Sequence, residues 1–377
     1  MNNASRELYI GLMSGTSMDG IDSAIVELEQ NSTKLIATYS HPIPELLQQA
    51  IKALFLPGDD NIDALGSADQ QLGICFAQAT TTLLKRAGLK ASDITAIGSH
   101  GQTVRHRPPS SNTPHPFTLQ IGDPNLITAR TGITTVADFR RRDMALGGQA
   151  APLVPAFHHA VFHSKTRNRA IVNIGGISNI TFLPVDGEVI GFDTGPGNRL
   201  LDDWIKQHKN KNFDDGGQWA GQHTSDPQLL EQLKTHPFLQ RSAPKSTGRE
   251  EFNRQWLDQE LKPFSHLSPG AVQATLLAFT AETIADALKA LPVEVDEVYI
   301  CGGGALNTTL MTRLSDLLAP ANVDSTETLG ISPEWVEAAA FAWLARQTLA
   351  GLAGNLPAVT GAKGLTVLGG IYPSYID

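Results

Sequence analysis

The sequence has 377 residues, of which 41 % are hydrophobic, and a formal net charge of −9. This length is typical of two domains, and the acidic balance argues against a nucleic-acid surface or an anionic membrane as the main partner. The only cysteines, Cys75 and Cys301, exclude a disulfide framework. The first residues hold no long apolar signal-peptide core, and no uncharged apolar run is long enough to span a bilayer, so we expect a cytoplasmic protein.

The first predicted element is a strand, a polar turn and a second strand. Residues 8–13 are mostly apolar, residues 21–28 roughly alternate, and the stretch between them is rich in glycine, hydroxyl and acidic side chains. Glycine allows close backbone approach, successive N–H groups bind anions, and a carboxylate can hold the waters of Mg²⁺. The loop therefore suits a phosphate, although it lacks the Lys-Ser/Thr pair of a P-loop. An ordinary glycine-turn hairpin explains the same pattern equally well.

Residues 44–54 and 67–84 are expected to form amphipathic helices, and residues 94–97 a buried strand. The polar residues after this strand include His100 and Gln102. Polar groups that follow a core strand in an α/β protein often face the active-site crevice. The alternative is a strand-ending turn in which His100 is hydrogen-bonded locally.

Residues 133–138 form the next predicted core strand, and it runs directly into Arg140, Arg141 and Arg142. A guanidinium group donates two parallel hydrogen bonds to a carboxylate or a phosphate, so this cluster is a candidate anion site. A charge run of this kind is otherwise a solvated face.

Residues 168–183 repeat the opening pattern of an apolar run, a Gly-Gly turn and an alternating strand, which predicts two similar halves. Residues 189–193 form another predicted strand, closed by Asp193 and followed by a glycine-containing loop up to Asn198, where a helix begins. A carboxylate at the end of a strand can be a general base at the mouth of a crevice. The alternative is a turn in which Asp193 caps the following helix.

Two further motifs stand in the C-terminal half. A strand over residues 297–301 leads into Gly302, Gly303 and Gly304, and Asn307 can cap the helix that follows. This arrangement suits a nucleotide, although the Rossmann spacing fails. A long helix is expected over residues 271–291, and a last one runs from Ser332 to about Leu349. It places Glu337 on its apolar face, where an acid is costly unless it is paired or belongs to a site.

Taken in order, the motifs resemble one family, the 1,6-anhydro-N-acetylmuramic acid kinases of bacterial cell-wall recycling and amino sugar catabolism. The matching stretches are GLMSGTSMDGID, SHGQTVRH, DFRRRDMALGGQ, NIGGISNIT, GFDTGPGN, STGREEFN, CGGGALN, SPEWVEAAAFAWLA and NLPAVTGA. Each stretch is weak alone, and the ordered set over nearly the whole chain is specific. One departure is visible: the family usually reads GGQGAPL, and here Ala150 stands in the place of the third glycine of that motif.

The resemblance implies an α/β protein with two RNase-H-like domains of the actin–hexokinase superfamily and an active-site cleft between them. Domain I would comprise residues 1–135 and about 350–377, and domain II residues 136–349. The implied ATP phosphate loop comprises Gly15, Thr16, Ser17, Met18, Asp19, Gly20, Ile21 and Asp22. Asp19 and Asp22 would hold Mg²⁺ through water, and Gly302, Gly303 and Gly304 would lie by the nucleotide.

The family's activity implies that Asp193, the general base, deprotonates a water that opens the anhydro sugar, while the 6-oxygen takes a phosphoryl group from ATP. The substrate-binding residues would be His100, Gln102, Arg140, Arg141, Arg142, Asn198 and Glu337, with the arginines meeting the lactyl carboxylate. A conventional sugar or acetate kinase, or an ATP-gated binding protein, are the alternatives, since fold alone does not fix function. Small-molecule substrates are the expected partners, and a homodimer is left open.

Overall fold

The computed structural model describes residues 7–15, 18, 20–29, 32–55, 62–109, 114–243, 245–248 and 251–374. The chain divides into two compact units, Met1–Val161 with Trp335–Asp377, and Phe162–Glu334. Both boundaries differ from those expected at residues 135 and 350. The first unit includes residues up to Val161. It also includes the chain from Trp335 onward, because the helix α12 (Val336–Leu349) packs against the strands β1 (Leu8–Met13) and β4 (Ala96–Ser99).

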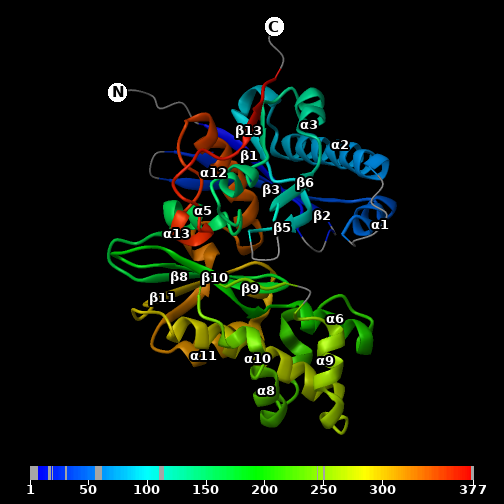
Figure 1. Cartoon of the computed structure of the whole chain (residues 1–377), viewed down its shortest axis with the longest axis vertical. Helices are drawn as coiled ribbons and strands as arrows, with labels where there is room; N and C mark the ends of the chain where they lie inside the picture. Colours follow the sequence, from blue (N-terminus) through cyan, green and yellow to red (C-terminus); the bar gives the residue numbers. More distant parts are fainter. Residues whose placement is uncertain are drawn as a thin grey trace. The chain divides into compact units, whose positions relative to one another are not determined.

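Unit 1 is built on a mixed sheet of strand order β13-β7-β4-β1-β2-β3. Four of these strands, β13, β1, β2 and β3, are labelled in Figure 1. The strands β1, β2 and β3 form an antiparallel meander, whereas β4 and β7 run parallel to β1. The remaining elements of unit 1 are β2 (Gly20–Leu28), β3 (Thr33–Pro42), α1 (Glu45–Ala53), α2 (Ile62–Ala87), β5 (Gln102–Arg107), β6 (Phe117–Ile121), α3 (Pro124–Thr131), β7 (Thr135–Ala137), α4 (Arg141–Ala145), α5 (Val154–Phe162), α13 (Pro357–Thr360) and β13 (Gly370–Tyr372).

Helices cover the sheet of unit 1. The helix α2 contacts β2 and β3, while α12 contacts β1, β2 and β4. Gly11 of β1 and Gly98 of β4 bring α12 very close, because a Cβ atom at either glycine would collide with the backbone of Ala338 or Phe341. Alanines 338–340 supply the small side chains that this approach needs. The first turn of α12, which carries Glu337, is thereby fixed against the central strands.

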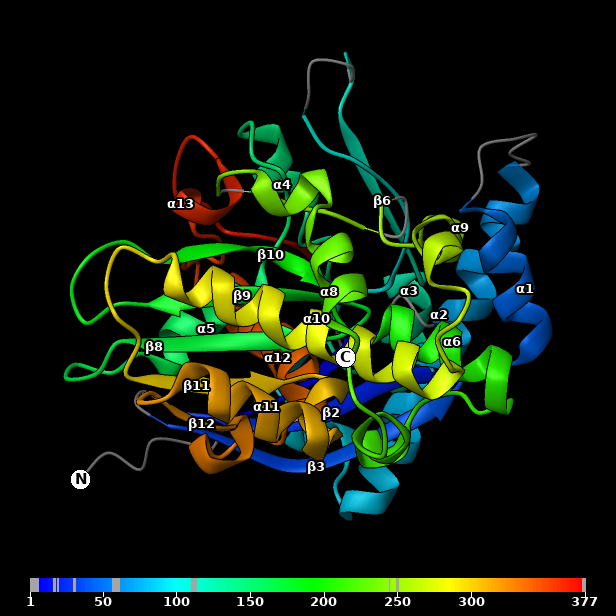
Figure 2. The same ribbon diagram turned by 90° about the horizontal axis from the view of Figure 1, so that it is seen from below.

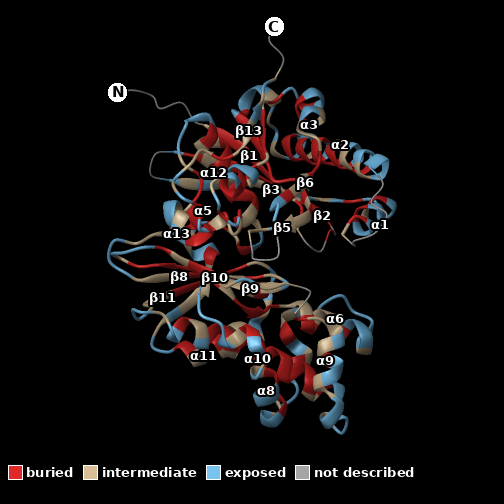
Figure 3. Cartoon of the chain, viewed as in Figure 1, coloured by how far each residue is buried: buried red, intermediate tan, exposed pale blue. Residues whose placement is uncertain are grey.

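Unit 2 has a five-stranded sheet of order β10-β9-β8-β11-β12. The helices α10 and α11 run across one face of it (Figure 2), and the middle of α10 and the central strands are buried (Figure 3). The elements of unit 2 are β8 (Arg169–Ile174), β9 (Ile177–Leu183), β10 (Ile190–Pro196), α6 (Arg199–Lys209), α7 (Gln218–Gly221), α8 (Pro227–Lys234), α9 (Arg254–Glu260), α10 (Pro269–Lys289), β11 (Glu297–Cys301), α11 (Thr308–Leu318) and β12 (Asn322–Ser325).

Both units share one topology. In unit 2, β8, β9 and β10 are an antiparallel meander, and β11 and β12 run parallel to β8, which repeats the pattern of β1, β2, β3, β4 and β7. Three antiparallel strands followed by two parallel ones, with the first strand in the middle, are the RNase-H-like arrangement, so the predicted fold is confirmed. The last strand of unit 1, β13, begins at Gly370 and pairs with β7. Among the described residues, no helix is both long and apolar enough to cross a membrane.

Candidate functional site

The turn between β1 and β2 begins with a buried hydroxyl. The Oγ of Ser14 donates a hydrogen bond of 2.7 Å to the Oε1 of Gln102. Gln102 is itself almost fully buried, and it anchors this turn to the start of β5. Next to it, a Cβ atom added to Gly15 would meet nothing within 4 Å. The glycine is therefore not required by packing among the described residues.

The remaining residues of the predicted phosphate loop divide into three groups. Met18 is buried with a φ of 56°, in the left-handed region. Gly20, Ile21 and Asp22 belong to β2 and pair with β3, so they form the wall of the loop and not its tip. Thr16, Ser17 and Asp19 lie outside the described residues.

His100 follows β4 and is held as a neutral ring. Its Nδ1 lies 2.9 Å from the carbonyl oxygen of Gly101, and its Nε2 accepts a hydrogen bond of 2.9 Å from the Nε of Arg140. Because Nε2 accepts a hydrogen bond, Nδ1 carries the proton and donates a hydrogen bond to the carbonyl oxygen of Gly101. Burial and, secondarily, the charge of Arg140 hold the pKa of His100 well below its ordinary value. His100 thus orients Arg140 through one hydrogen bond and is itself held by a local one to Gly101.

The three arginines do not act as one group. Arg140 turns toward His100 and donates from Nη1 to the carbonyl oxygen of Ala150 at 2.6 Å. Arg141 forms an ion pair of 2.6 Å with Asp138, and its side chain is 66 % exposed. Arg142 is also exposed. Burial lowers the pKa of Arg140 to about 10, against the opposing effect of Glu337 and Asp143. The predicted cluster is therefore reduced to Arg140.

Glu337 stands in the first turn of α12 and interacts electrostatically with Arg140 and Asp22. Burial raises its pKa, the negative charge of Asp22 adds to this effect, and Arg140 opposes it. Two carboxylates and one guanidinium, from β2, α12 and the segment after β7, therefore lie close enough in unit 1 to influence one another electrostatically. Hard oxygen donors of this kind suit Mg²⁺ held through water, although no group of three or more His, Cys, Asp or Glu side chains within the described ranges could hold a metal ion directly.

Asp143 is a structural centre that the sequence analysis missed. This carboxylate is fully buried, and it accepts hydrogen bonds from the backbone N–H of Ala150, the amide of Asn355 and the hydroxyl of Thr360, at 2.9, 2.9 and 2.8 Å. It ties α4 to the loop that ends at Ala150 and to the segment around α13. No spacing signal could have found it, because two of its partners lie more than two hundred residues away in the sequence.

Ala150 adopts a φ of 59° and is fully buried. For a residue with a Cβ atom the left-handed region costs about 1–2 kcal/mol, which explains why a glycine suits this position. We expect Ala150→Gly to raise the free energy of unfolding by about 0.5–1 kcal/mol, after allowance for the larger entropy of glycine in the unfolded chain. Chemical denaturation measures this change. Ala145→Gly in α4 is the matched control and should lower stability; a loss at both positions would contradict the argument.

Asp193 lies within β10 and not at its end. The strand continues to Pro196 through an irregularity between Asp193 and Gly195, so the predicted strand end is wrong. The backbone N–H of Asp193 donates to the carbonyl oxygen of Lys245 at 3.0 Å, and its Oδ2 accepts from the backbone N–H of Thr247 at 2.9 Å. Because β10 is the outer strand of its sheet, the segment 245–247 can hold Asp193 from the open side.

The glycine run after β11 has a packing reason. A Cβ atom at Gly302 or Gly304 would collide with Ile174 of β8 or its neighbour, and Gly302 has a φ of 77°. Gly303 is less confined, because a Cβ atom there would approach only the Nδ2 of Asn198, at 3.6 Å. This amide donates to the carbonyl oxygen of Ile174 at 3.1 Å. Gly303 and Asn198 thus lie together at the ends of β8 and β11.

Two RNase-H-like units, each opening with a glycine-turn hairpin, define a protein of the actin–hexokinase superfamily. Residues 7–374 match the family model described as anhydro-N-acetylmuramic acid kinase. Proteins of that name from Shewanella woodyi and Shewanella loihica are 50 % and 52 % identical to this chain, cover 98 % of it, and are themselves covered over 100 % and 99 % of their lengths. The chain belongs to the anhydro-N-acetylmuramic acid kinase family, and it is an enzyme of the kinase class.

Proposed function

We propose that this protein uses ATP to convert 1,6-anhydro-N-acetylmuramic acid into N-acetylmuramic acid 6-phosphate, a reaction of cell-wall recycling. The family match over nearly the whole chain is the observation that carries the proposal. The local structure around Asp193 supports it, because a carboxylate held by the segment 245–247 is fixed in orientation, as a general base must be.

The substrate dictates an unusual step. In a 1,6-anhydro sugar the 6-oxygen is bonded to the anomeric carbon, so no free 6-hydroxyl exists. Asp193 takes a proton from a water whose oxygen bonds to the anomeric carbon, the bond from that carbon to the 6-oxygen breaks, and the 6-oxygen receives the γ-phosphoryl group as ADP leaves. In the ordinary sugar-kinase alternative, Asp193 would take the proton of a substrate hydroxyl instead.

Unit 1 supplies the groups that fit phosphate and metal. The turn that contains Gly15 presents backbone at a position where packing leaves room, and Asp22 with Glu337 provides carboxylate oxygen. Mg²⁺, when bound through water to such carboxylates, neutralises phosphate charge, which is the main requirement of phosphoryl transfer. His100 keeps Arg140 in place, and Arg140 is the arginine that we assign to the lactyl carboxylate.

Turnover with a panel of acceptors tests the proposal. We expect ADP release with 1,6-anhydro-N-acetylmuramic acid and none with N-acetylmuramic acid or acetate. Anhydro-N-acetylglucosamine, which lacks the lactyl group, should have a much lower kcat/KM because a charged hydrogen-bonded pair is lost, at a cost on the order of 2–5 kcal/mol. ATP hydrolysis without any sugar would favour a binding protein, and equal kcat/KM for the two anhydro sugars would remove the role given to Arg140.

Gly15→Val tests the phosphate loop. Among the described residues a Cβ atom at Gly15 would meet no atom within 4 Å, so the variant should fold normally. We expect a KM for ATP raised by about tenfold or more, equivalent to at least about 1.4 kcal/mol of lost binding, since a branched side chain would occupy the space of the phosphates. Gly364→Val, at another glycine with an unfilled Cβ position, is the control and should be neutral. An unchanged KM in folded Gly15→Val would make this hairpin purely structural.

A further inference from the structure

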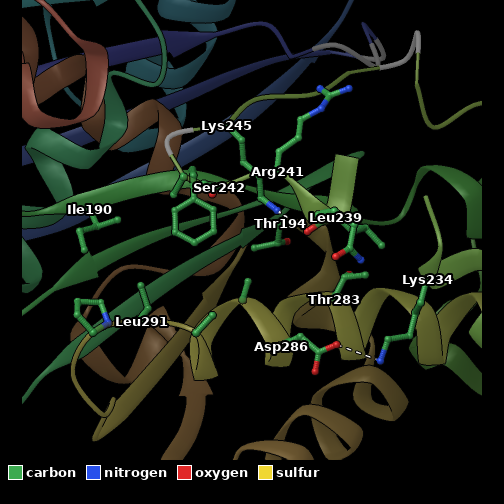
Figure 4. A pocket seen from close by; sticks show the side chains of 16 residues that line it. Ile190, Thr194, Lys234, Leu239, Arg241, Ser242, Lys245, Thr283, Asp286 and Leu291 are labelled. Atoms are coloured by element: carbon green, nitrogen blue, oxygen red, sulfur yellow. Dashed lines mark hydrogen bonds and ion pairs between the residues drawn. The ribbon is translucent and has the colours of Figure 1, made fainter. Parts of the chain in front are cut away.

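A cavity of ≈ 510 Å³ lies in unit 2 between β10, the C-terminal half of α10, residues 239–243 and Lys245 (Figure 4). Its volume falls within the range of small-molecule sites in proteins. Ile190, Phe192 and Thr194 of β10 line it. Because side chains alternate along a strand, Asp193 faces the opposite side of the sheet. The cavity is therefore distinct from the place where the Asp193 carboxylate acts.

The walls are largely apolar, and the charged groups around the opening differ in what they contact. Arg241 forms an ion pair with Glu251 at 2.8 Å, and Figure 4 shows its guanidinium group pointing away from the other lining side chains. Lys234 and Asp286 also line the cavity, and they form an ion pair of 3.0 Å between Nζ and Oδ2. Neither cation is thus left in need of an anionic ligand.

Lys245 is different. Its Nζ donates to the main-chain carbonyl oxygens of Leu239 at 3.1 Å and Phe238 at 3.5 Å, and it lies 4.8 Å from the centroid of the Phe238 ring. Within the described parts of the chain, no carboxylate pairs with it. Burial, together with the nearby charge of Arg241, lowers its pKa. A half-buried ammonium group without a counter-ion is unfavourable, and an anion that enters the cavity would relieve this cost.

We propose that this cavity is a second ligand site, which binds a small organic anion with an apolar body through Lys245. An inorganic ion would leave most of the volume unfilled and the apolar wall of Ile190, Phe192 and Leu291 in contact with water. A compound with a carboxylate at one end and a hydrophobic ring or chain at the other satisfies both the charge and the wall.

Occupancy of this site is connected to Asp193 through the main chain. The carbonyl oxygen of Lys245 accepts a hydrogen bond from the backbone N–H of Asp193. Two residues later, the backbone N–H of Thr247 donates a hydrogen bond to the Asp193 carboxylate. A ligand that holds the Lys245 side chain therefore restricts the segment that orients the carboxylate. The site therefore lies where a bound ligand would affect the orientation of the Asp193 carboxylate. This proposal does not depend on which acceptor the enzyme phosphorylates.

Calorimetric titration with 4-phenylbutyrate, and with the neutral 4-phenylbutanamide of the same shape, tests the proposal without turnover. We expect the acid to bind the wild-type protein at least about tenfold more tightly than the amide. Lys245→Met should remove that preference. Ala287→Trp, which narrows the cavity from α10 and keeps the charge, should abolish binding of both compounds, whereas Lys262→Met at an exposed position should change nothing.

Hydrogen exchange supplies a second readout on the wild-type protein. The amides of Asp193 and Thr247 should exchange more slowly when 4-phenylbutyrate is bound, because the bound acid restricts the motion of the segment 245–247 that contacts Asp193. Absence of binding at millimolar concentration, equal affinity for acid and amide, or binding that survives both Lys245→Met and Ala287→Trp would each overturn the proposal. Circular dichroism of each variant confirms that a loss of binding is not a loss of fold.

Discussion

Asp193→Asn is expected to lower kcat by roughly 10²–10⁴, the range for loss of a general base. The substitution retains the shape of the side chain, and the amide oxygen of asparagine can still accept the N–H of Thr247. What disappears is the capacity to take a proton from water. The KM for the sugar and for ATP should therefore change little, because the same contacts remain available in the ground state. Steady-state kinetics of the folded variant measure both quantities.

The control for this variant is Asp186→Asn, the same chemical change at an exposed position shortly before β10, which should leave kcat as it is. Reaction in ¹⁸O-labelled water adds an independent test of the proposed step. The label should enter the anomeric position of the product and be absent from the phosphate. Unlabelled product incubated in the same water for the same time corrects for exchange of the anomeric hydroxyl. Label in the phosphate, or full activity of Asp193→Asn, would contradict the role of Asp193.

Asp143→Asn is expected to destabilise unit 1 by about 3 kcal/mol. The carboxylate accepts three hydrogen bonds from donors on separate segments, and it is fully buried. Asparagine would place an N–H₂ donor against at least one of these donors, and it would remove the charge that strengthens the others. For a unit of this size the melting temperature should fall by roughly 6–12 °C. Differential scanning calorimetry measures the effect.

Asp138→Asn is the matched control, since Asp138 precedes the same helix but pairs with the exposed Arg141. An exposed pair contributes at most about 1 kcal/mol, and asparagine tolerates the left-handed φ of 61° at this position well. We therefore expect a small change there. If Asp143→Asn melted within about 2 °C of the wild-type protein, the carboxylate would be replaceable and the segment around α13 would be held by other contacts.

Much of the fold could be predicted from the sequence. Apolar runs marked the central strands β1, β4, β8 and β11, and the repeated glycine-turn hairpin indicated two similar halves. The motifs in their order pointed to the family to which the chain belongs. These features are local, since a strand reveals itself through the periodicity of its own side chains and a loop through its own glycines.

The candidate site was predicted less completely. His100 and Arg140 were singled out because each follows a predicted core strand, and Glu337 because it lies on the apolar face of a helix. The structure brings all three together in unit 1. The sequence could not separate Arg140 from Arg141 and Arg142, because adjacent residues of one type differ only in what they meet after folding. It also placed Asp193 at a strand end, because the irregularity at Gly195 leaves no trace in the hydrophobic pattern.

By itself, the sequence determined the family, the two α/β halves, and the residue types available for phosphate, metal and general-base chemistry. Only the tertiary structure decided that Asp143 joins segments more than two hundred residues apart, that Ala150 takes a glycine conformation, and that Lys245 borders a cavity behind the strand of Asp193. The physical reason is the same in each case. These properties depend on hydrogen bonds and enclosed space between segments that are distant in the chain, and neither residue spacing nor composition encodes such contacts.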